Sequence, residues 1–205
     1  MDASFLAELN ERLFVQFAQG LWRAPLGQRL LPVLPFDGGR MGRIVCAEQR
    51  DIERALIGLG AGHADLSAMH AAWQDLQHTA RALRTVEGFA DSTHSTHALT
   101  LPGQGPLVLL SAAQTPIAVL AGLLLAGATR GVLWKPAPAA AASAHLLMRA
   151  MGPLAGGNLA LLQGDHQTGA GLTGKGALIW ASPLPVPEGL GDPVLSLAAT
   201  APRRR

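Results

Sequence analysis

Cysteine is nearly absent from this chain of 205 residues, in which Cys46 is the only one. No disulfide can form within the chain, and such sparse use of cysteine favours a reducing compartment, so we expect a cytoplasmic protein. Charged residues are also scarce, at 15% of the sequence, and the formal net charge is only +2. A balance so close to neutral gives no reason to expect a nucleic-acid partner, and three terminal arginines, 203–205, are typical of a solvated end.

A convincing membrane span is also missing. Residues 106–129 carry no charge and are long enough to cross a bilayer, but Ser111, Gln114 and Thr115 interrupt them. The continuous apolar part, 117–128, has the length of a core helix. The acidic, amphipathic N-terminus does not have the basic flank and apolar block of a signal peptide. We therefore expect no membrane association, and we expect the 49% of hydrophobic residues to fill a core.

The first half of the chain predicts helices and a hairpin. We expect an amphipathic helix over 4–19, because its apolar residues recur at helical spacing. Two β-prone runs flank the turn residues 36–39 and predict a β-hairpin. A helix is expected to start at Asp51 and run through "DIERALIGLGAGHADL", and another is expected over 66–89.

The second half alternates short apolar runs with helical segments. Strands are expected at 106–110, 131–134, 158–163 and 176–181, and helices at 116–128 and 139–151. This alternation predicts an α/β fold with a Rossmann-like parallel sheet flanked by helices. We expect one domain, 1–182, with a polar linker at 90–104. The tail, 183–205, is expected to be irregular because four prolines fall within eleven residues.

The order of four segments from residue 105 to 182 carries a family resemblance. The segments are "GPLVLLSAAQTP", "AGATRGVLWKPAP", "GNLALLQGDHQTGAGL" and "ALIWAS". They resemble the cofactor-binding half of the aldehyde dehydrogenase superfamily, which reads Ser-Pro-Trp-Asn-Phe-Pro, Lys-Pro-Ala/Ser-Glu, Val-Asn-Leu-Val-x-Gly and Phe-Thr-Gly-Ser in that order. Upstream, "GLWRAP", "MGRIVCAEQRDIERAL" and "AAWQDLQHTARALR" resemble the family's first hairpin and helices. The resemblance covers about residues 15 to 182.

The resemblance implies a cofactor, NAD or NADP, and four residues that would contact it. Lys135 corresponds to a lysine that reaches the adenosine ribose, although an ordinary solvated lysine at a strand end is the alternative. Ser182 corresponds to the serine of a Gly-Ser backbone that lies against the pyrophosphate, with Ala181 in place of the glycine. Ser111 stands at the first turn, and Gln114 falls where the family has its oxyanion-stabilising asparagine.

The departures from the family pattern imply a chain without aldehyde chemistry of its own. The nucleophilic cysteine of the family would lie beyond the last residue here, and Cys46 reads as a small buried residue instead. The general-base glutamate has no counterpart, since residues 188–191 lack its order and context. Glutamine at 114 is one methylene longer than asparagine, which would misplace its amide. Pro138 stands where the family has a ribose-binding glutamate and offers no side-chain acceptor.

Two motif-like strings are better explained by turns and linkers. "GAGLTGKG" at 169–176 resembles both a GxGxxG fingerprint and a Walker loop, but it runs into a strand instead of opening a helix. A flexible turn is the better interpretation. "STHSTH" places His94 and His97 three residues apart, yet no third metal ligand is offered nearby, which favours an exposed linker.

Three functions stay open from the sequence. The favoured one is a non-catalytic aldehyde-dehydrogenase-like protein that binds a nucleotide weakly or serves as an assembly or regulatory partner. The second is an oxidoreductase component that acts on aldehydes with NAD(P) once a separate catalytic chain complements it. The third is a protein-interaction module on an α/β scaffold without a nucleotide. A homo-oligomer or a separate aldehyde-dehydrogenase-type chain is the partner expected from the resemblance.

Overall fold

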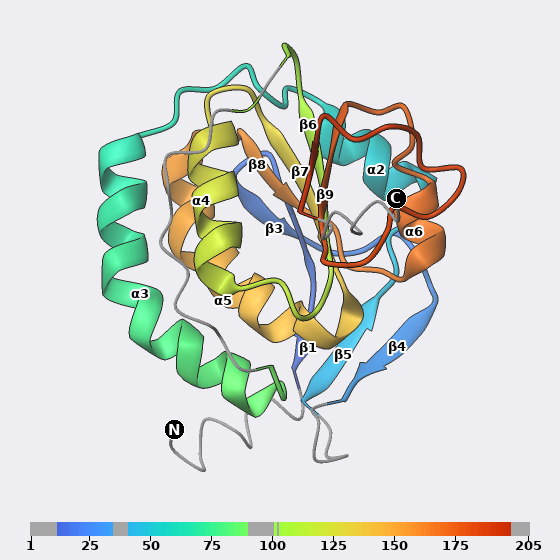
Figure 1. Ribbon diagram of the computed structural model, residues 1–205, viewed down its shortest axis with the longest axis horizontal. Coiled ribbons are helices and arrows are strands. Elements are labelled where there is room, and N and C mark those ends of the chain that lie inside the picture. The colour runs from blue at the N-terminus through green and yellow to red at the C-terminus, as the bar shows by residue number, and fades with distance from the viewer. Residues whose placement is uncertain (1–11, 35–40, 90–100, 102, 198–205) are drawn as a thin grey trace, which may run out of the picture.

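The computed structural model describes residues 12–34, 41–89, 101 and 103–197. Their main unit is a seven-stranded sheet in the order β10-β9-β6-β7-β8-β2-β3 (Figure 1). Its parallel centre consists of β6 (Leu107–Ser111), β7 (Val132–Pro136), β8 (Leu159–Leu161) and β9 (Ala177–Ala181). This arrangement confirms the expected α/β fold with a parallel sheet flanked by helices.

The two central strands, β6 and β7, belong to the parallel part of the sheet and are covered on both faces. Every residue of β6 and β7 is buried, and their register pairs Leu109 with Trp134. Strands buried on both faces read as continuous apolar runs without alternation, which is the pattern that predicted them.

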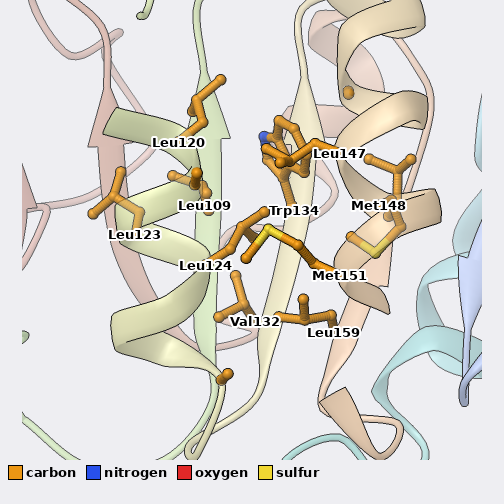
Figure 2. Close-up of a cluster of buried hydrophobic side chains, with 14 of the residues drawn as sticks. Leu109, Leu120, Leu123, Leu124, Val132, Trp134, Leu147, Met148, Met151 and Leu159 are labelled. Carbon is orange, nitrogen blue, oxygen red and sulfur yellow. The ribbon is translucent and has the colours of Figure 1, made fainter. Parts of the chain in front are cut away.

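Three helices cover one face of the sheet: α3 (Leu66–Val86), α4 (Ile117–Gly127) and α5 (Ala141–Met151). Figure 2 shows the side chains of α4 and α5 meeting those of the strands between them. Trp134 of β7 lies at the centre of this cluster and is wholly buried. Because α4 is apolar on all sides and packs between the sheet and α3, it is a core helix.

The opposite face is covered more thinly. Two short helices, α2 (Gln49–Leu56) and α6 (His166–Ala170), lie there, together with the segment that follows β9 (Figure 1). A separate apolar cluster forms on this side from Ile52 and Ala55 of α2 and Val108, Leu110 and Leu133 of the sheet.

The expected hairpin is present. Strands β4 (Leu30–Val33) and β5 (Gly42–Val45) pair antiparallel, and the predicted turn between them lies outside the described residues. A parallel partner on the other side of β5, β1 (Leu13–Phe14), completes a small three-stranded sheet.

The predicted N-terminal helix over 4–19 is wrong for its described part. The chain forms β1, then β2 (Gln16–Ala18), which pairs with β8 through Phe17 and Leu161 and turns back into β3 (Leu21–Arg23). Phe14 and Phe17 are each 1% exposed. Their burial in two different sheets outweighs the helical spacing of the apolar residues, because strand pairing depends on partners distant in the sequence.

Three further differences concern helix and strand limits. Helix α2 ends at Leu56, because the following segment turns at Gly58 and Gly60, which have φ of 70° and 87°. Helix α6 occupies part of the string that was expected to be a flexible turn. In the tail, β10 (Leu195–Ser196) pairs with β9, so the tail is not irregular throughout, although its strand lies at the sheet edge, where proline-rich segments are tolerated.

Several expectations fall outside the described residues: the start of the N-terminal helix, nearly all of the linker 90–104, His94, His97 and the three terminal arginines. Across the described part of the chain, no helix combines the length and apolarity needed to cross a membrane. The same residues contain no group of three or more histidine, cysteine, aspartate or glutamate side chains placed to hold a metal ion.

Candidate functional site

The topology identifies one edge of the sheet as the place for a ligand. From β6 the chain moves outward through α4, β7, α5 and β8, and then returns through α6 to β9 on the other side of β6. The connections therefore diverge between β6 and β9, which opens a crevice at the carboxyl ends of these strands. Open α/β sheets bind their ligands at such a point.

A cavity of about 440 Å³ lies at this edge, on the face that α6 covers. Its size is within the range of small-molecule sites, about 300–1,000 Å³. Its lining comes from the ends of the central strands, from the loop after β7, from α6 and from the tail. The residues are Leu110, Ser111, Ala112, Lys135, Ala137, Pro138, His166, Gly169, Ala170, Trp180, Pro187, Glu188 and Leu190.

Lys135 is the charged group that the fold buries at this cavity. It belongs to β7, is 8% exposed, and its ammonium makes no hydrogen bond or ion pair with another described residue. Burial lowers the pKa of Lys135 to about 8, while the charges of Asp165 and Cys46 oppose that change. A methyl group at Gly169 of α6 would lie 4.0 Å from Nζ, which places the ammonium against that helix. The lysine is therefore not the ordinary solvated one that was the alternative.

The carboxylate at the start of α6 is already engaged. Asp165 caps α6 by accepting hydrogen bonds from the backbone N–H groups of Gln167 and Thr168, and it forms a bidentate pair with Arg29. Hydrogen bonding from Arg29 is the main reason that the pKa of Asp165 lies well below its usual range. Two N–H groups at the start of α6 are therefore occupied internally, and Lys135 is the buried cation that lines the cavity for an anionic ligand.

The four residues predicted as cofactor contacts are only partly brought together. Ser111 and Lys135 both line the cavity, and Ser111 Oγ accepts a hydrogen bond of 2.9 Å from Trp134 Nε1. Ser182 is 1% exposed next to the strand end and accepts a hydrogen bond from the N–H of Leu184. Gln114 is exposed in the turn after β6 and is not among the lining residues. The cofactor role of all four stays a prediction.

The lining that the tail contributes to this cavity was not predicted. Pro187, Glu188 and Leu190 come from the segment between β9 and β10, which crosses the sheet face without a helix. Trp180 Nε1 donates to the carbonyl of Leu184 at 2.7 Å and so fixes the start of this crossing. A resemblance that ended at residue 182 could not indicate that Glu188 and Pro138 would line the same cavity.

Two contacts fix the turn after β6, where the crevice opens. The hydroxyl of Thr115 donates a hydrogen bond of 2.5 Å to the carbonyl of Ala181, which joins this turn to the end of β9. The buried guanidinium of Arg84 donates to the carbonyl of Ala113. The turn is thus held by the end of β9 and by α3, which preorganises the mouth of the cavity.

Cys46 does not have the environment of a nucleophile. It is 1% exposed, and desolvation by burial raises the pKa of its thiol. A reactive cysteine needs exposure and a lowered pKa. The structure therefore supports the interpretation of Cys46 as a small core residue.

Comparison with solved structures identifies the architecture. The Delta-pyrroline-5-carboxylate dehydrogenase of Mycobacterium tuberculosis, bound with NAD and cobalamin, superposes with a TM-score of 0.66 at 14% identity over 86% of this chain. An aldehyde dehydrogenase of the same organism, complexed with NAD+, gives 0.61 at 16% identity over 79%. The aldehyde dehydrogenase of Bartonella henselae gives 0.58 at 17% identity over 79%. This chain has the fold of aldehyde dehydrogenases.

The likeness to aldehyde dehydrogenases is partial in length and low in identity. This chain covers 43%, 44% and 44% of the three matched structures, so it spans less than half the length of each. At identities this low, the TM-scores show a shared fold and nothing more. No protein-family model matches the sequence, and no curated protein matches it significantly. The expected resemblance in fold is confirmed, and activity has to be argued from the site.

Proposed function

We propose that this chain is an aldehyde-dehydrogenase-like protein that binds NAD or NADP at the Lys135 cavity and does not oxidise aldehydes alone. The observation that carries the proposal is the buried ammonium of Lys135, which has no partner among the described residues and lines a cavity at the carboxyl ends of β6, β7 and β9. Burying a cation without a partner is costly, so an anionic ligand would relieve that cost.

The residues of the cavity fit a nucleotide. Lys135 supplies a cationic donor for a phosphate or a ribose hydroxyl, and the carboxylate of Glu188 supplies an acceptor for ribose hydroxyls. Glu188 thereby replaces the acceptor that Pro138 cannot provide. Apolar surface comes from Pro138, Trp180 and Leu190, and such a combination of apolar walls with few polar groups is typical of small-molecule sites. We expect weak binding, because the N–H groups of Gln167 and Thr168 at the start of α6 already donate to Asp165 and are not available to the pyrophosphate.

Binding of the nucleotide would not by itself enable this chain to oxidise aldehydes. A bound nicotinamide accepts hydride from a substrate, and in covalent aldehyde oxidation an enzyme thiolate must first add to the carbonyl. Cys46, the only thiol, is buried with a raised pKa. We therefore propose an assembly or regulatory role in which nucleotide binding is the signal.

Thermal unfolding with and without cofactor tests the proposal. Ligand that binds only the folded state raises Tm according to the ratio of its concentration to its Kd. We expect millimolar NAD or NADP to raise Tm, and Lys135→Met to abolish that rise. The only other lysine, Lys175, is exposed, so Lys175→Met is the matched control and should respond as the wild type does. An equal response from all three proteins, or from none, would contradict the proposal.

The burial of the thiol supports a second candidate. Because Cys46 is buried with a raised pKa, an aldehyde-oxidising complex would need its reactive thiolate from a second polypeptide. That candidate predicts NAD reduction only after mixing with such a chain.

A homo-oligomer is the other proposed partner, and light scattering of the purified chain distinguishes the two. The lone buried cysteine supports the cytoplasm as the proposed compartment.

A further inference from the structure

A second hollow lies between the N-terminal strands and α5 and shares no lining residue with the Lys135 cavity. Its volume is about 380 Å³. Its lining residues are Arg12, Leu13, Val15, Trp22, His145 and Arg149. The proposed nucleotide site uses none of these side chains.

The charge in this hollow is all of one sign. Arg12 comes just before β1 and Arg149 lies in the last turn of α5. The side chains of both make no hydrogen bond or ion pair with any described residue, and none of the described residues that line the hollow has a carboxylate. By contrast, Arg29, Arg54 and Arg84 each pair with a carboxylate. Two unpaired guanidinium groups at one concavity attract anions.

His145 of α5 forms part of the wall of the hollow, and its ring orientation is fixed. The ring stacks on Trp22 with centroids 4.2 Å apart, and Phe14 contacts it edge-on at 5.4 Å. Burial, reinforced by the charges of Arg12 and Arg149, lowers the pKa of His145 to about 4. The imidazole is therefore neutral at pH 7, with one nitrogen that donates and one that accepts.

The buried environment selects the tautomer. Nδ1 is buried without a hydrogen-bond partner among the described residues, whereas Nε2 is not among the buried unpaired atoms. An unpaired acceptor is tolerated in a protein interior more often than an unpaired N–H. We therefore assign the proton to Nε2, where it remains able to donate. The described lining of the hollow then offers two guanidinium groups and one imidazole N–H, and no carboxylate.

From this donor set we propose that the hollow binds a small oxyanion of the phosphate or carboxylate type, held by Arg12 and Arg149, with Nε2 of His145 as a third donor. Guanidinium forks match the paired oxygens of both anions. A bound anion also counters the two positive charges next to the ring.

Titration of the purified chain with inorganic phosphate and with succinate, at constant ionic strength set by sodium chloride, tests the site. Tryptophan fluorescence follows occupancy through Trp22, the one of the four tryptophans that lines the hollow and stacks on His145, and calorimetry gives Kd. Saturation by phosphate alone or by succinate alone supports the proposal and identifies the anion. Arg12→Gln and Arg149→Gln should each weaken binding by roughly ten- to hundredfold, the usual range for charge-assisted hydrogen bonds.

The controls separate a specific site from general ion screening. Arg50 is exposed on α2 outside the hollow, so Arg50→Gln should bind as the wild type does. His145→Gln should retain part of the affinity, because both guanidinium groups remain. Absence of saturation, or equal weakening in the Arg50, Arg12 and Arg149 variants, would overturn the proposal. Failure of NAD to bind at the other cavity would leave this result unaffected.

Discussion

One carboxylate oxygen of Glu87 accepts a hydrogen bond of 2.8 Å from the backbone N–H of Ser143. Glu87 follows the end of α3, and Ser143 lies in the first turn of α5, 56 residues later. The other oxygen pairs with Arg84 at 2.9 Å, and both side chains are almost fully buried. Because Arg84 also donates to Ala113, the pair connects two helices to the turn at which the nucleotide crevice opens.

Replacing Glu87 by Gln should destabilise the fold. The substitution keeps the shape but leaves the Arg84 cation buried without a counter-charge, and breaking a buried pair in this way costs about 3–5 kcal/mol. Urea unfolding followed by circular dichroism would measure the loss. Arg84→Met combined with Glu87→Gln should lose less than the two single losses together. Additive losses would mean that the two side chains act independently.

Lys135 should make stability depend on pH in the alkaline range. Its pKa is about 8 in the folded chain and 10.5 as the reference for the unfolded chain. Between these values the unfolded chain binds more protons, so the free energy of unfolding should rise as the pH increases from 8 to 10.5. A pKa difference of this size corresponds to about 3 kcal/mol.

Lys135→Met serves as the comparison for that rise. It should be more stable than the wild type at pH 7, because it removes a buried charge, and it should lack most of the increase above pH 8. Chemical unfolding of both proteins at intervals of pH provides the measurement. Parallel curves for the two proteins would show that Lys135 is solvated.

His145 should make the stability of the fold depend on pH in the acidic range. Its pKa is lowered from 6.5 to about 4, so the unfolded chain binds more protons within that window. The free energy of unfolding should therefore fall as the pH drops from 6.5 to 4, by on the order of 2 kcal/mol for a ring that retains some solvent contact. His145→Gln should flatten the profile in phosphate-free buffer. An unchanged slope would indicate that other groups carry the acid dependence.

Gln163 is a position at which a substitution should stabilise the fold. It is fully buried, and neither Oε1 nor Nε2 of its amide has a partner among the described residues. Gln163→Met keeps a similar length and removes two unsatisfied polar atoms, so we expect a gain of about 1–2 kcal/mol in the free energy of unfolding.

The neighbouring Gln16 is the matched control for that gain. It is equally buried, but its amide is paired at both ends, with the N–H of Gln163 at 2.7 Å and the carbonyl of Val45 at 3.1 Å. Gln16→Met should therefore destabilise. Thermal melts of both variants decide the point, and a loss in Gln163→Met would reveal a buried water that satisfies its amide.

The sequence was informative wherever an element is determined by local composition. The apolar runs at 106–110 and 131–134 predicted the two central parallel strands, and the all-apolar run between them predicted a core helix. The N-terminal strands could not be recognised in this way. Phe14 and Phe17 are at helical spacing, and only their pairing with β5 and β8, which come much later in the chain, makes them strands.

The candidate site was predictable for the residues that end strands. Ser111 and Lys135 converge because the carboxyl ends of parallel strands meet at one edge. The position of Glu188 depends on how an irregular crossing lies over the sheet, and proline-rich composition specifies no such path. The depth of Lys135 was also hidden, because α6, which comes later in the chain, lies against its side chain.

The central claim is that the buried Lys135 ammonium holds a nucleotide at this sheet edge. Calorimetric titration of NAD into the wild type and Lys135→Met, at pH 7 and at pH 9, tests it most directly. We predict saturable binding by the wild type that weakens at pH 9, where a lysine with a pKa of about 8 is largely neutral, and no measurable binding by the variant. Equal affinity of the two proteins, or wild-type binding that does not change with pH, would contradict the account.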